Sequence, residues 1–295
     1  MKPGIIINPD AGFHRRLGRA ERLRLVKDAF AFCSTKGDVA FTEGPGTARA
    51  IARRMIRAGT NNLVVWGGDG TINEVASEAI PARVIIGIVP SGSGNGLARE
   101  LSIERSPVEA LRTALRGSIQ NLDVGQIDGR VFVNVAGIGF DAHLAGVFNR
   151  LRRRGSAAYM MSGLRELLAY VPGNYSIEFS LEKFRMSALI LCCANGRHYG
   201  SGAIIAPNAK TDDGKIELVC IPALSRLSVL WNIPRLFFGT VDRLNGVRTV
   251  SVDKVEIGSE EPLFFHVDGE VFSGGTTLQV SVLPKALCVR VPRLS

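Results

Sequence analysis

Residues 63–76 read LVVWGGDGTINEVA, an apolar strand that turns into a helix through three glycines. Glycine lets a backbone adopt positive φ and approach a ligand closely, because it has no Cβ. The first turn of a helix adds unpaired N–H groups and a partial positive charge. The pattern therefore predicts a loop that holds phosphate groups.

A second junction of the same kind follows in the sequence. Residues 85–101 read IIGIVPSGSGNGLAREL, again an apolar strand, a glycine-rich turn and a helix. Two such turns on neighbouring parallel strands would lie at one edge of a sheet and face one crevice. We interpret this pair of turns as a nucleotide-binding site.

Composition is typical of a globular protein with one large or two ordinary domains. The chain has 295 residues, of which 46% are hydrophobic and 21% charged. The five cysteines show no metal-ligand spacing, so we expect reduced thiols in a reducing compartment. We recognise no signal peptide in the sequence. We also find no apolar run close to the ~18 residues that a membrane span needs. A cytoplasmic location is expected.

The net charge of +9 requires an anionic partner. Basic residues gather in two groups: Arg15, Arg16, Arg19, Arg22 and Arg24, then Arg150, Arg152, Arg153 and Arg154. Aromatic residues do not alternate with them, so nucleic acid is not the favoured partner. The first group fits the solvated face of an amphipathic helix. Attraction to an anionic membrane surface needs no further motif, and we predict peripheral association with the inner face of the membrane.

The pattern of elements changes near residue 122. Before it, strands at 4–7 and 38–42 alternate with helices at about 17–34 and 47–57, the pattern of a parallel sheet covered on both faces. After it, short strands are predicted at 121–127, 130–136, 176–182, 186–194 and 215–221. Asp-Gly turns at 128, 213 and 268 have hairpin chemistry. We predict an α/β domain at 1–122 and a mainly β domain at 123–295, whose final residues could return to the first.

Seven ordered motifs resemble those of diacylglycerol kinase- and sphingosine kinase-like lipid kinases, over essentially the whole chain. They are NPDAG at 8–12, GGDGTINEV at 67–75, PSGSGNGLA at 90–98, LDVG at 122–125, GIGFD at 137–141, APNA at 206–209 with DDG at 212–214, and VDGE at 267–270. GGDGT alone also occurs in NAD kinases, whereas the ordered set is specific. The resemblance implies a nucleotide-binding α/β domain with a parallel sheet, a C-terminal β-sandwich-like domain, and phosphorylation of a lipid hydroxyl by ATP.

Phosphoryl transfer depends on positioning and on stabilising charge at phosphate oxygens. Backbone N–H groups of the first turn and the hydroxyls of Thr71 and Ser93 are suited to the phosphates. Asp69 is suited to a Mg²⁺ that bridges them, or to capping the helix that follows. By resemblance, Asn8 lies near the adenosine and Thr42 lines the nucleotide. The predicted nucleotide set is Asn8, Thr42, Gly67, Gly68, Asp69, Gly70, Thr71, Asn73, Glu74 and Ser93.

Glu270 is the second predicted catalytic residue beside Asp69. From the local sequence it is an exposed carboxylate after a tight Asp268-Gly269 turn. The resemblance to the family's Asp-Gly-Glu implies that it accepts the proton of the lipid hydroxyl as the general base.

The Asp212-Asp213-Gly214 turn is, from sequence alone, an ordinary acidic loop. By resemblance it is a structural Mg²⁺ site with hard oxygen ligands. Asp213 would supply a carboxylate, Lys210 and Lys215 backbone carbonyls, and Asp123 a contact through water.

Several alternatives stay open. The acceptor is diacylglycerol-like or sphingoid-base-like, because Asn95-Gly96 in the second turn is closer to the sphingoid-base kinases. Residues 157–171 and 227–238 are acyl-chain or membrane contacts, or core helices. Two other functions are also possible from the sequence: phosphorylation of a soluble substrate such as NAD, and nucleotide sensing without catalysis. Whether the chain forms a homodimer is open.

Overall fold

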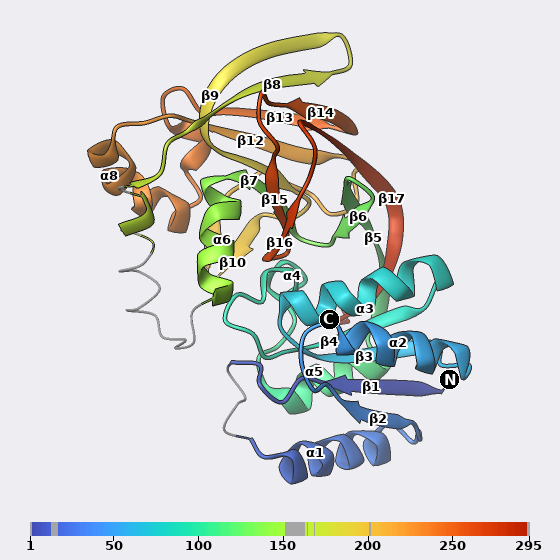
Figure 1. Cartoon of the computed structure of the whole chain (residues 1–295). Helices are drawn as coiled ribbons and strands as arrows, with labels where there is room; N and C mark the ends of the chain where they lie inside the picture. The colour runs from blue at the N-terminus through green and yellow to red at the C-terminus, as the bar shows by residue number, and fades with distance from the viewer. Residues whose placement is uncertain are drawn as a thin grey trace. The chain divides into compact units, whose positions relative to one another are not determined.

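The computed structural model describes residues 2–12, 17–150, 163, 165–167, 169–200 and 202–293. The chain divides into two compact units (Figure 1). Unit 1 contains Met1–Val124 and Pro284–Ser295, and unit 2 contains Gly125–Leu283.

Unit 1 is built on a parallel sheet, as predicted. Its central strands are β1 (Pro3–Ile7), β2 (Asp38–Phe41), β3 (Asn62–Gly67) and β4 (Ile85–Pro90). They lie in the order β2-β1-β3-β4, and every pair is parallel. All residues of β1 and β3 are buried, which explains their continuous apolar sequence.

Five helices accompany this sheet: α1 (Arg19–Phe32), α2 (Thr47–Arg57), α3 (Asp69–Ala82), α4 (Gly96–Glu100) and α5 (Pro107–Arg116). Helices α2 and α3 pack together on one face of the sheet, and α1 and α5 pack together on the other (Figure 1). The sheet is therefore covered on both faces, as its strand pattern predicts.

Arg22 corrects the interpretation of the first basic group as a solvated helix face. Its side chain is fully buried. The guanidinium donates to the carbonyl oxygens of Leu17, Asn8 and Pro9 at 3.1, 2.8 and 3.1 Å and lies 5.5 Å from the Trp66 ring. Arg22 thus fixes the connection between β1 and α1. Arg15, Arg16 and residues 152–154 of the basic groups lie outside the described residues.

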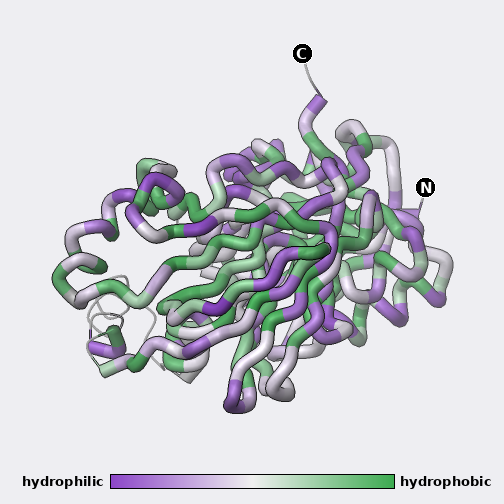
Figure 2. Tube along the Cα trace, turned by 90° about the horizontal axis from the view of Figure 1, so that it is seen from above, coloured by the Kyte–Doolittle hydropathy of each residue, from purple (hydrophilic) through white to green (hydrophobic). Residues whose placement is uncertain are grey.

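Unit 2 consists mainly of antiparallel strands that enclose an apolar core, the β-sandwich-like domain predicted from the sequence. The strands are β6 (Arg130–Phe132), β7 (Val135–Gly139), β8 (Gly173–Phe179), β9 (Glu182–Ala194), β10 (His198–Gly200), β11 (Ala203–Ile204), β12 (Ile216–Pro222), β13 (Arg248–Val252), β14 (Lys254–Gly258), β15 (Phe264–Val267) and β16 (Glu270–Ser273). Hydrophobic and hydrophilic residues alternate along many of them (Figure 2). Ile177, Leu191, Leu218, Ile257 and Phe265 belong to one core cluster.

Long β9 organises unit 2. It pairs with β8 and β7 in antiparallel register and with β12 on its other edge. Helix α6 (Phe140–Arg150), helix α8 (Arg226–Phe237) and the 3₁₀ turn η1 (Val241–Arg243) accompany the strands. Leu189 of β9, Phe140 of α6 and Leu230 of α8 meet in a small apolar cluster. Part of α8 is therefore core, one of the two interpretations of residues 227–238.

Two of the three Asp-Gly turns form hairpins. The pairs at Asp128 and Asp268 have positive φ at both residues and connect β5 (Ser118–Ile127) to β6 and β15 to β16. The pair at Asp213 instead precedes β12, which pairs with β9 and β13. Its prediction as a hairpin turn is wrong, because the chain before it forms no neighbouring strand.

Two strands contain residues of both units. Strand β5 (Ser118–Ile127) begins in unit 1, and strand β17 (Thr277–Val291) begins in unit 2 and ends in unit 1. Within unit 2, β17 pairs with β14 through Thr277–Ser281. Within unit 1, Val289 pairs with Ile86 of β4 in parallel register. No helix in the described part of the chain is long and apolar enough to cross a membrane.

Candidate active site

The two glycine-rich turns of unit 1 lie against one another, as predicted. The Ser91 N–H donates to the Gly67 carbonyl at 2.9 Å, and a Cβ placed on Gly68 would lie 3.0 Å from the Gly92 Cα. The Ser91 hydroxyl reaches the carbonyl of Ala11 at 3.2 Å. The turns after β1, β3 and β4 therefore meet at the carboxyl edge of the parallel sheet, where ligands bind in open α/β sheets.

Asn8 links the first of these turns to α3. Its Nδ2 donates to Thr71 Oγ1 at 3.0 Å, and its Oδ1 accepts the Asp10 N–H at 3.0 Å. Thr42, which follows β2, is buried, and its N–H donates to the Ile7 carbonyl at 2.8 Å. Asn8, Thr42 and Thr71 thus all lie at the carboxyl edge of the sheet.

The first turn needs its glycines because the missing Cβ leaves room for neighbouring atoms, and not because its backbone adopts a positive φ. Neither Gly67, Gly68 nor Gly70 has positive φ among the residues described, which corrects the conformational expectation for this turn. Gly68 permits contact with Gly92, and a Cβ on Gly67 would lie 2.7 Å from the Thr71 Cβ. A Cβ on Gly70 would meet no protein atom within 4 Å. Gly70 therefore borders open space at the start of α3.

Asp69 is the first residue of α3, and its carboxylate faces the start of the next helix, α4. Burial raises the pKa of Asp69, while backbone N–H bonds from Gly96, Leu97 and Asn95 act to lower it. Its Oδ1 is buried and has no hydrogen-bond partner in the described part of the chain. Asp69 therefore orders the second turn and keeps one acceptor oxygen available. The sequence left open that the Asp69 side chain caps α3, but the N–H groups named above belong to the segment around α4.

Glu74 organises the start of α2. Its two carboxylate oxygens accept N–H groups of Gly46 and Arg49 at 2.9 and 3.1 Å. This contact gives Glu74 a structural function beside the nucleotide function predicted for it. Asn73 is buried in α3, and Ser93 is exposed in the second turn.

In unit 2, Glu270 is exposed and begins β16, directly after the Asp268–Gly269 turn. The turn is firmly held. The Asp268 carboxylate accepts the N–H groups of Val133, Asn134 and Val135 at 2.8, 3.0 and 3.1 Å. The sequence predicted a turn at Asp268, but it did not predict Asp268 itself to be a functional residue.

A buried pair of side chains supports the same turn and was missed by the sequence analysis. His266 Nε2 lies 2.8 Å from Asp141 Oδ2, and both side chains are buried. In the neutral imidazole, His266 Nδ1 accepts the Gly269 N–H at 3.2 Å. Burial acts to lower the pKa of His266, but the carboxylates of Asp141 and Asp268 together raise it. The only sequence feature that indicated a functional role for this pair was the GIGFD motif, which contains Asp141.

The predicted structural Mg²⁺ ligands are divided between the units. Lys210, Asp213 and Lys215 belong to unit 2, and Asp123 belongs to unit 1. Asp213 Oδ1 accepts the Lys215 N–H at 3.1 Å, and Asp123 Oδ1 accepts the Lys285 N–H at 2.7 Å. The described residues contain no group of three or more His, Cys, Asp or Glu side chains placed to hold a metal. A site made largely of backbone carbonyls stays a prediction.

Comparison with known families matches both parts of the chain. Residues 2–127 match the model of the diacylglycerol kinase catalytic domain. Residues 134–291 match the model of the YegS C-terminal NAD kinase beta sandwich-like domain.

Individual relatives agree with these matches. A protein of Chromohalobacter salexigens named "Probable lipid kinase YegS-like" is 30% identical over 93% of this chain and 91% of its own length. A protein of the same name from Pseudomonas aeruginosa is 32% identical over 84% of this chain and 82% of its own. A crystal structure of a diacylglycerol kinase from Bacillus anthracis has a TM-score of 0.77 at 20% identity, covering 98% of this chain and 96% of that one.

Proposed function

Because the chain belongs to the YegS-like lipid kinases with the diacylglycerol kinase fold, we propose that it transfers the γ-phosphoryl group of ATP to a lipid hydroxyl. The acceptor is diacylglycerol-like or sphingoid-base-like. The proposal rests mainly on one observation, the meeting of the turns after β1, β3 and β4 beside the open space at Gly70.

The residues of unit 1 suit a nucleotide triphosphate. Near Gly70 a ligand can approach the first turn of α3, where backbone N–H groups and the helix dipole favour anions. The Asn8 amide holds the Thr71 hydroxyl at 3.0 Å, so that this hydroxyl has a fixed direction. Fixed donors cost no reorganisation when charge develops on phosphate oxygens.

Asp69 is suited to be a ligand of Mg²⁺. Mg²⁺ is commonly held by one or two carboxylates together with substrate phosphates, and Asp69 Oδ1 lacks a hydrogen-bond partner in the described part of the chain. When bound, Mg²⁺ would neutralise charge on the phosphates. Asp69 itself also holds the N–H groups of Asn95, Gly96 and Leu97, so the same carboxylate would shape the second turn.

Glu270 is the proposed general base. An exposed carboxylate can accept a hydroxyl proton as the bond to phosphorus forms. Its backbone position is fixed by the three N–H groups on Asp268 and by the Gly269 bond to His266. Asp268 and His266 are positioning residues in this proposal.

Helix α8 is the proposed membrane contact. Its Leu227 and Trp231 are 80% and 86% exposed, and Phe238, which follows the helix, is 79% exposed. Val229 and Leu230 of the same helix pack inward. Trp and Phe beside a cationic residue, here the exposed Arg235, are typical of helices that lie in a membrane interface. Of the other predicted membrane or acyl-chain segment, 157–171, residues 157–162, 164 and 168 lie outside the described residues.

The test is a phosphorylation assay with radiolabelled ATP and Mg²⁺. The acceptors are diacylglycerol, monoacylglycerol, ceramide and sphingosine in mixed micelles, with NAD as the soluble acceptor. We expect labelled lipid from at least one of them and none from NAD. Labelled NAD alone, or ATP binding with no labelled product, would overturn the proposal in favour of a soluble-substrate kinase or a nucleotide sensor.

A further inference from the structure

In unit 2, a buried carboxylate and a buried imidazole support the turn that leads to Glu270. Asp141 lies near the start of α6 and His266 lies in β15, and Asp141 Oδ2 is 2.8 Å from His266 Nε2. A Cβ on Gly137 of β7 would overlap Asp141 Oδ2 and lie 2.6 Å from His266 Nε2. The pair therefore fills the space that the absent side chain of Gly137 leaves.

The contacts of His266 decide which of its ring nitrogens carries the proton. Nδ1 accepts the Gly269 N–H at 3.2 Å, so this nitrogen has no proton while the bond exists. The single proton of the neutral ring is then on Nε2, which faces the Asp141 carboxylate. The partner of one ring nitrogen sets the protonation of the other. Asp141 thus favours the one neutral tautomer that can hold the Gly269 N–H.

A second proton on His266 reverses this contact. In the imidazolium both ring nitrogens are donors. The Nδ1 proton would then meet the Gly269 N–H, and two donors cannot bond to each other. Burial disfavours the charged ring, but the Asp141 and Asp268 carboxylates favour it more strongly, so the pKa of His266 is raised from its usual 6.5. Protonation near neutral pH therefore removes the acceptor of the Gly269 N–H.

Asp141 and Asp268 supply the charges that act on the ring, and two uncharged titratable groups also face the pair. The Tyr199 ring of β10 meets the His266 ring edge-on, with the ring centroids 6.5 Å apart. The Cys192 thiol of β9 is fully buried, and burial together with the charge of Asp141 holds its pKa well above the ordinary value. A phenol and such a thiol carry no charge near neutral pH. The charge on His266 is therefore governed by the two carboxylates.

Gly269 is the point at which the turn can respond to this proton. Asp268, which precedes it, is held by the N–H groups of residues 133–135. Gly269 has a φ of +91°, and a Cβ placed on it would meet no protein atom within 4 Å. Glycine adopts a wide range of backbone angles at little cost. A rotation at Gly269 therefore moves Glu270, the next residue, while Asp268 stays in place.

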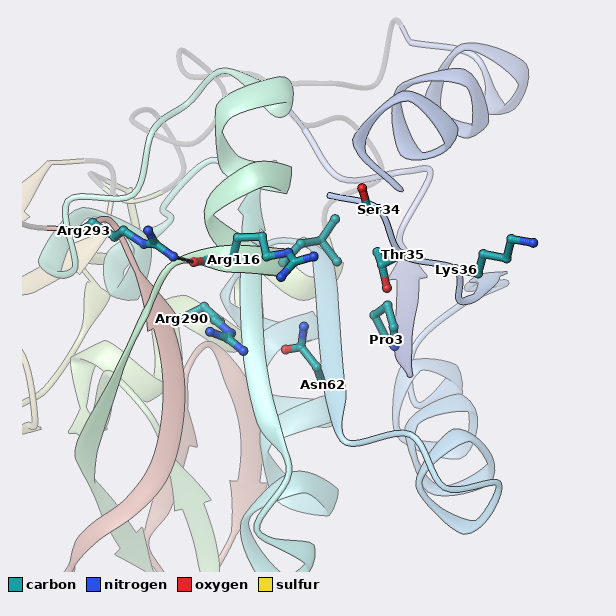
Figure 3. Close-up of a pocket in the computed structure, with 9 residues that line it drawn as sticks. Pro3, Ser34, Thr35, Lys36, Asn62, Arg116, Arg290 and Arg293 are labelled. Atoms are coloured by element: carbon teal, nitrogen blue, oxygen red, sulfur yellow. Dashed lines mark hydrogen bonds between the residues drawn. The ribbon is translucent and has the colours of Figure 1, made fainter. Parts of the chain in front are cut away.

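Two other clusters of charge in the chain differ from this pair. The lining of a pocket of about 500 Å³ in unit 1 (Figure 3) includes three arginines, Arg116, Arg290 and Arg293. Arginine keeps its proton at every pH at which a kinase is assayed. In unit 2, His143 Nε2 lies 2.7 Å from Glu166 Oε2, but both side chains are partly exposed. Among the described residues, His143 has no hydrogen bond to the Asp268–Glu270 turn.

We propose that Asp141 and His266 position Glu270 and make its position depend on one proton. Neutral His266 holds the Gly269 N–H, and the imidazolium releases it, so turnover falls as pH falls. The proposal rests on the function proposed above, in which Glu270 is the general base. It requires only that one acceptor becomes a donor, and no other contact of the turn has to change.

The pH dependence of turnover tests this proposal. Turnover is measured from pH 5.5 to 8.5 with saturating ATP, Mg²⁺ and the lipid that is phosphorylated fastest. In the unaltered protein we expect kcat to fall about fivefold on the acid side, the scale of one hydrogen bond, with a midpoint above pH 6.5. The KM for ATP should not follow, because neither residue belongs to the nucleotide turns. Asp141→Asn should move the midpoint to lower pH, since it removes a carboxylate that raises the pKa of His266.

Two substitutions of His266 separate the effect of the proton from a purely structural contribution. His266→Asn places a carbonyl oxygen near the position of Nδ1, where it can accept the Gly269 N–H at every pH. It should keep the turnover at high pH and lose the acid decrease. His266→Gln places its oxygen near the position of Nε2 and should be about fivefold slower at every pH. His143→Asn, at a histidine that also pairs with a carboxylate, is the control and should keep the pH profile of the unaltered protein.

NMR on the unaltered protein follows the proton without a substitution. With isotope-labelled histidine and glycine, His266 should have one protonated ring nitrogen at high pH and two at low pH, and the Gly269 amide signal should shift with the same midpoint. A ring that does not titrate, a flat pH profile in an active enzyme, or an acid decrease that persists in His266→Asn would overturn the proposal. Absence of turnover at every pH would overturn the proposed function instead, and the Gly269 signal would then decide alone whether the proton moves the turn.

Discussion

Asn8 Nδ2 donates a hydrogen bond to Thr71 Oγ1 at 3.0 Å, across 63 positions of sequence. The bond connects the end of β1 with the first turn of α3. It fixes the side chain of Asn8, whose Oδ1 also holds the Asp10 N–H. The proposed phosphate-binding hydroxyl is thus oriented by the neighbouring strand before any ligand arrives.

Gly70→Val should abolish ATP binding and leave the fold intact. A Cβ at Gly70 meets no protein atom within 4 Å, and its φ is compatible with other residues. Valine is a better helix former than glycine, so the free energy of unfolding should change by less than about 1 kcal/mol. The measurements are calorimetric titration with ATP and urea denaturation. ATP affinity near that of the unaltered protein would exclude Gly70 from the nucleotide site.

Glu270→Gln should reduce turnover about 10²-fold or more, the scale expected for loss of a general base. The amide has the size and polarity of the carboxylate but cannot accept the proton. Because Glu270 is exposed, ATP affinity and thermal stability should change little. Glu261→Gln, an exposed carboxylate elsewhere in unit 2, is the control and should keep full turnover. If the turnover of Glu270→Gln stays within a few-fold of normal, Glu270 is not the general base, and Asp69 becomes the next candidate.

Arg22→Met should lower the free energy of unfolding by about 2–4 kcal/mol, within the range for breaking a buried polar network. Three carbonyl oxygens lose their donor, and methionine fills only part of the space over Trp66. Arg24→Met, at an exposed position of the same helix, should change stability by no more than about 0.5 kcal/mol. Urea denaturation compares the two. Equal small effects would contradict the structural function of Arg22.

The stability contribution of His266 should decrease as pH rises. Since Asp141 and Asp268 raise the pKa of His266 above its usual value of 6.5, the folded state holds the proton more tightly than the unfolded state. The part of the contribution that depends on the charged imidazolium is complete below about pH 6.5 and is lost as pH rises through the pKa of the folded state, whereas the neutral imidazole keeps the bond from the Gly269 N–H. Unfolding free energies of the unaltered protein and His266→Gln are measured from pH 5.5 to 8.5. Their difference should shrink with pH, and a constant or growing difference would refute this assignment.

Vesicle binding should depend on the exposed apolar face of α8. Trp231→Ser removes a side chain that is 86% exposed, so it should weaken binding about tenfold without altering the core. Leu181→Ser, at a fully exposed position between β8 and β9, should not weaken it. The affinity should also require anionic lipid and fall with salt, because charges are screened beyond about 10 Å at ~0.1 M. Equal binding by both variants would exclude α8 as the contact.

Much of the fold follows from local patterns. The apolar strands, the glycine-rich turns and the Asp-Gly hairpins at 128 and 268 were predictable, because each depends on neighbouring residues. The burial of Arg22 was not, since its carbonyl acceptors lie up to 14 positions away and its helix otherwise carries exposed charges. The pair of His266 and Asp141 joins residues 125 positions apart, and nothing near His266 in sequence indicates it. Asp69 was predicted as a ligand, but its bonds to the segment around Asn95 appear only in the folded structure.

The path of β17 has a consequence for synthesis of the protein. Val289 pairs with Ile86 of the parallel sheet, and residues 284–293 belong to unit 1. While a ribosome is making unit 2, the edge of β4 that receives β17 has no strand beside it. An unpaired sheet edge invites pairing with other chains. The nascent unit 1 therefore has an aggregation-prone edge until β17 has been made, and a fragment that ends at residue 124 would keep that edge permanently.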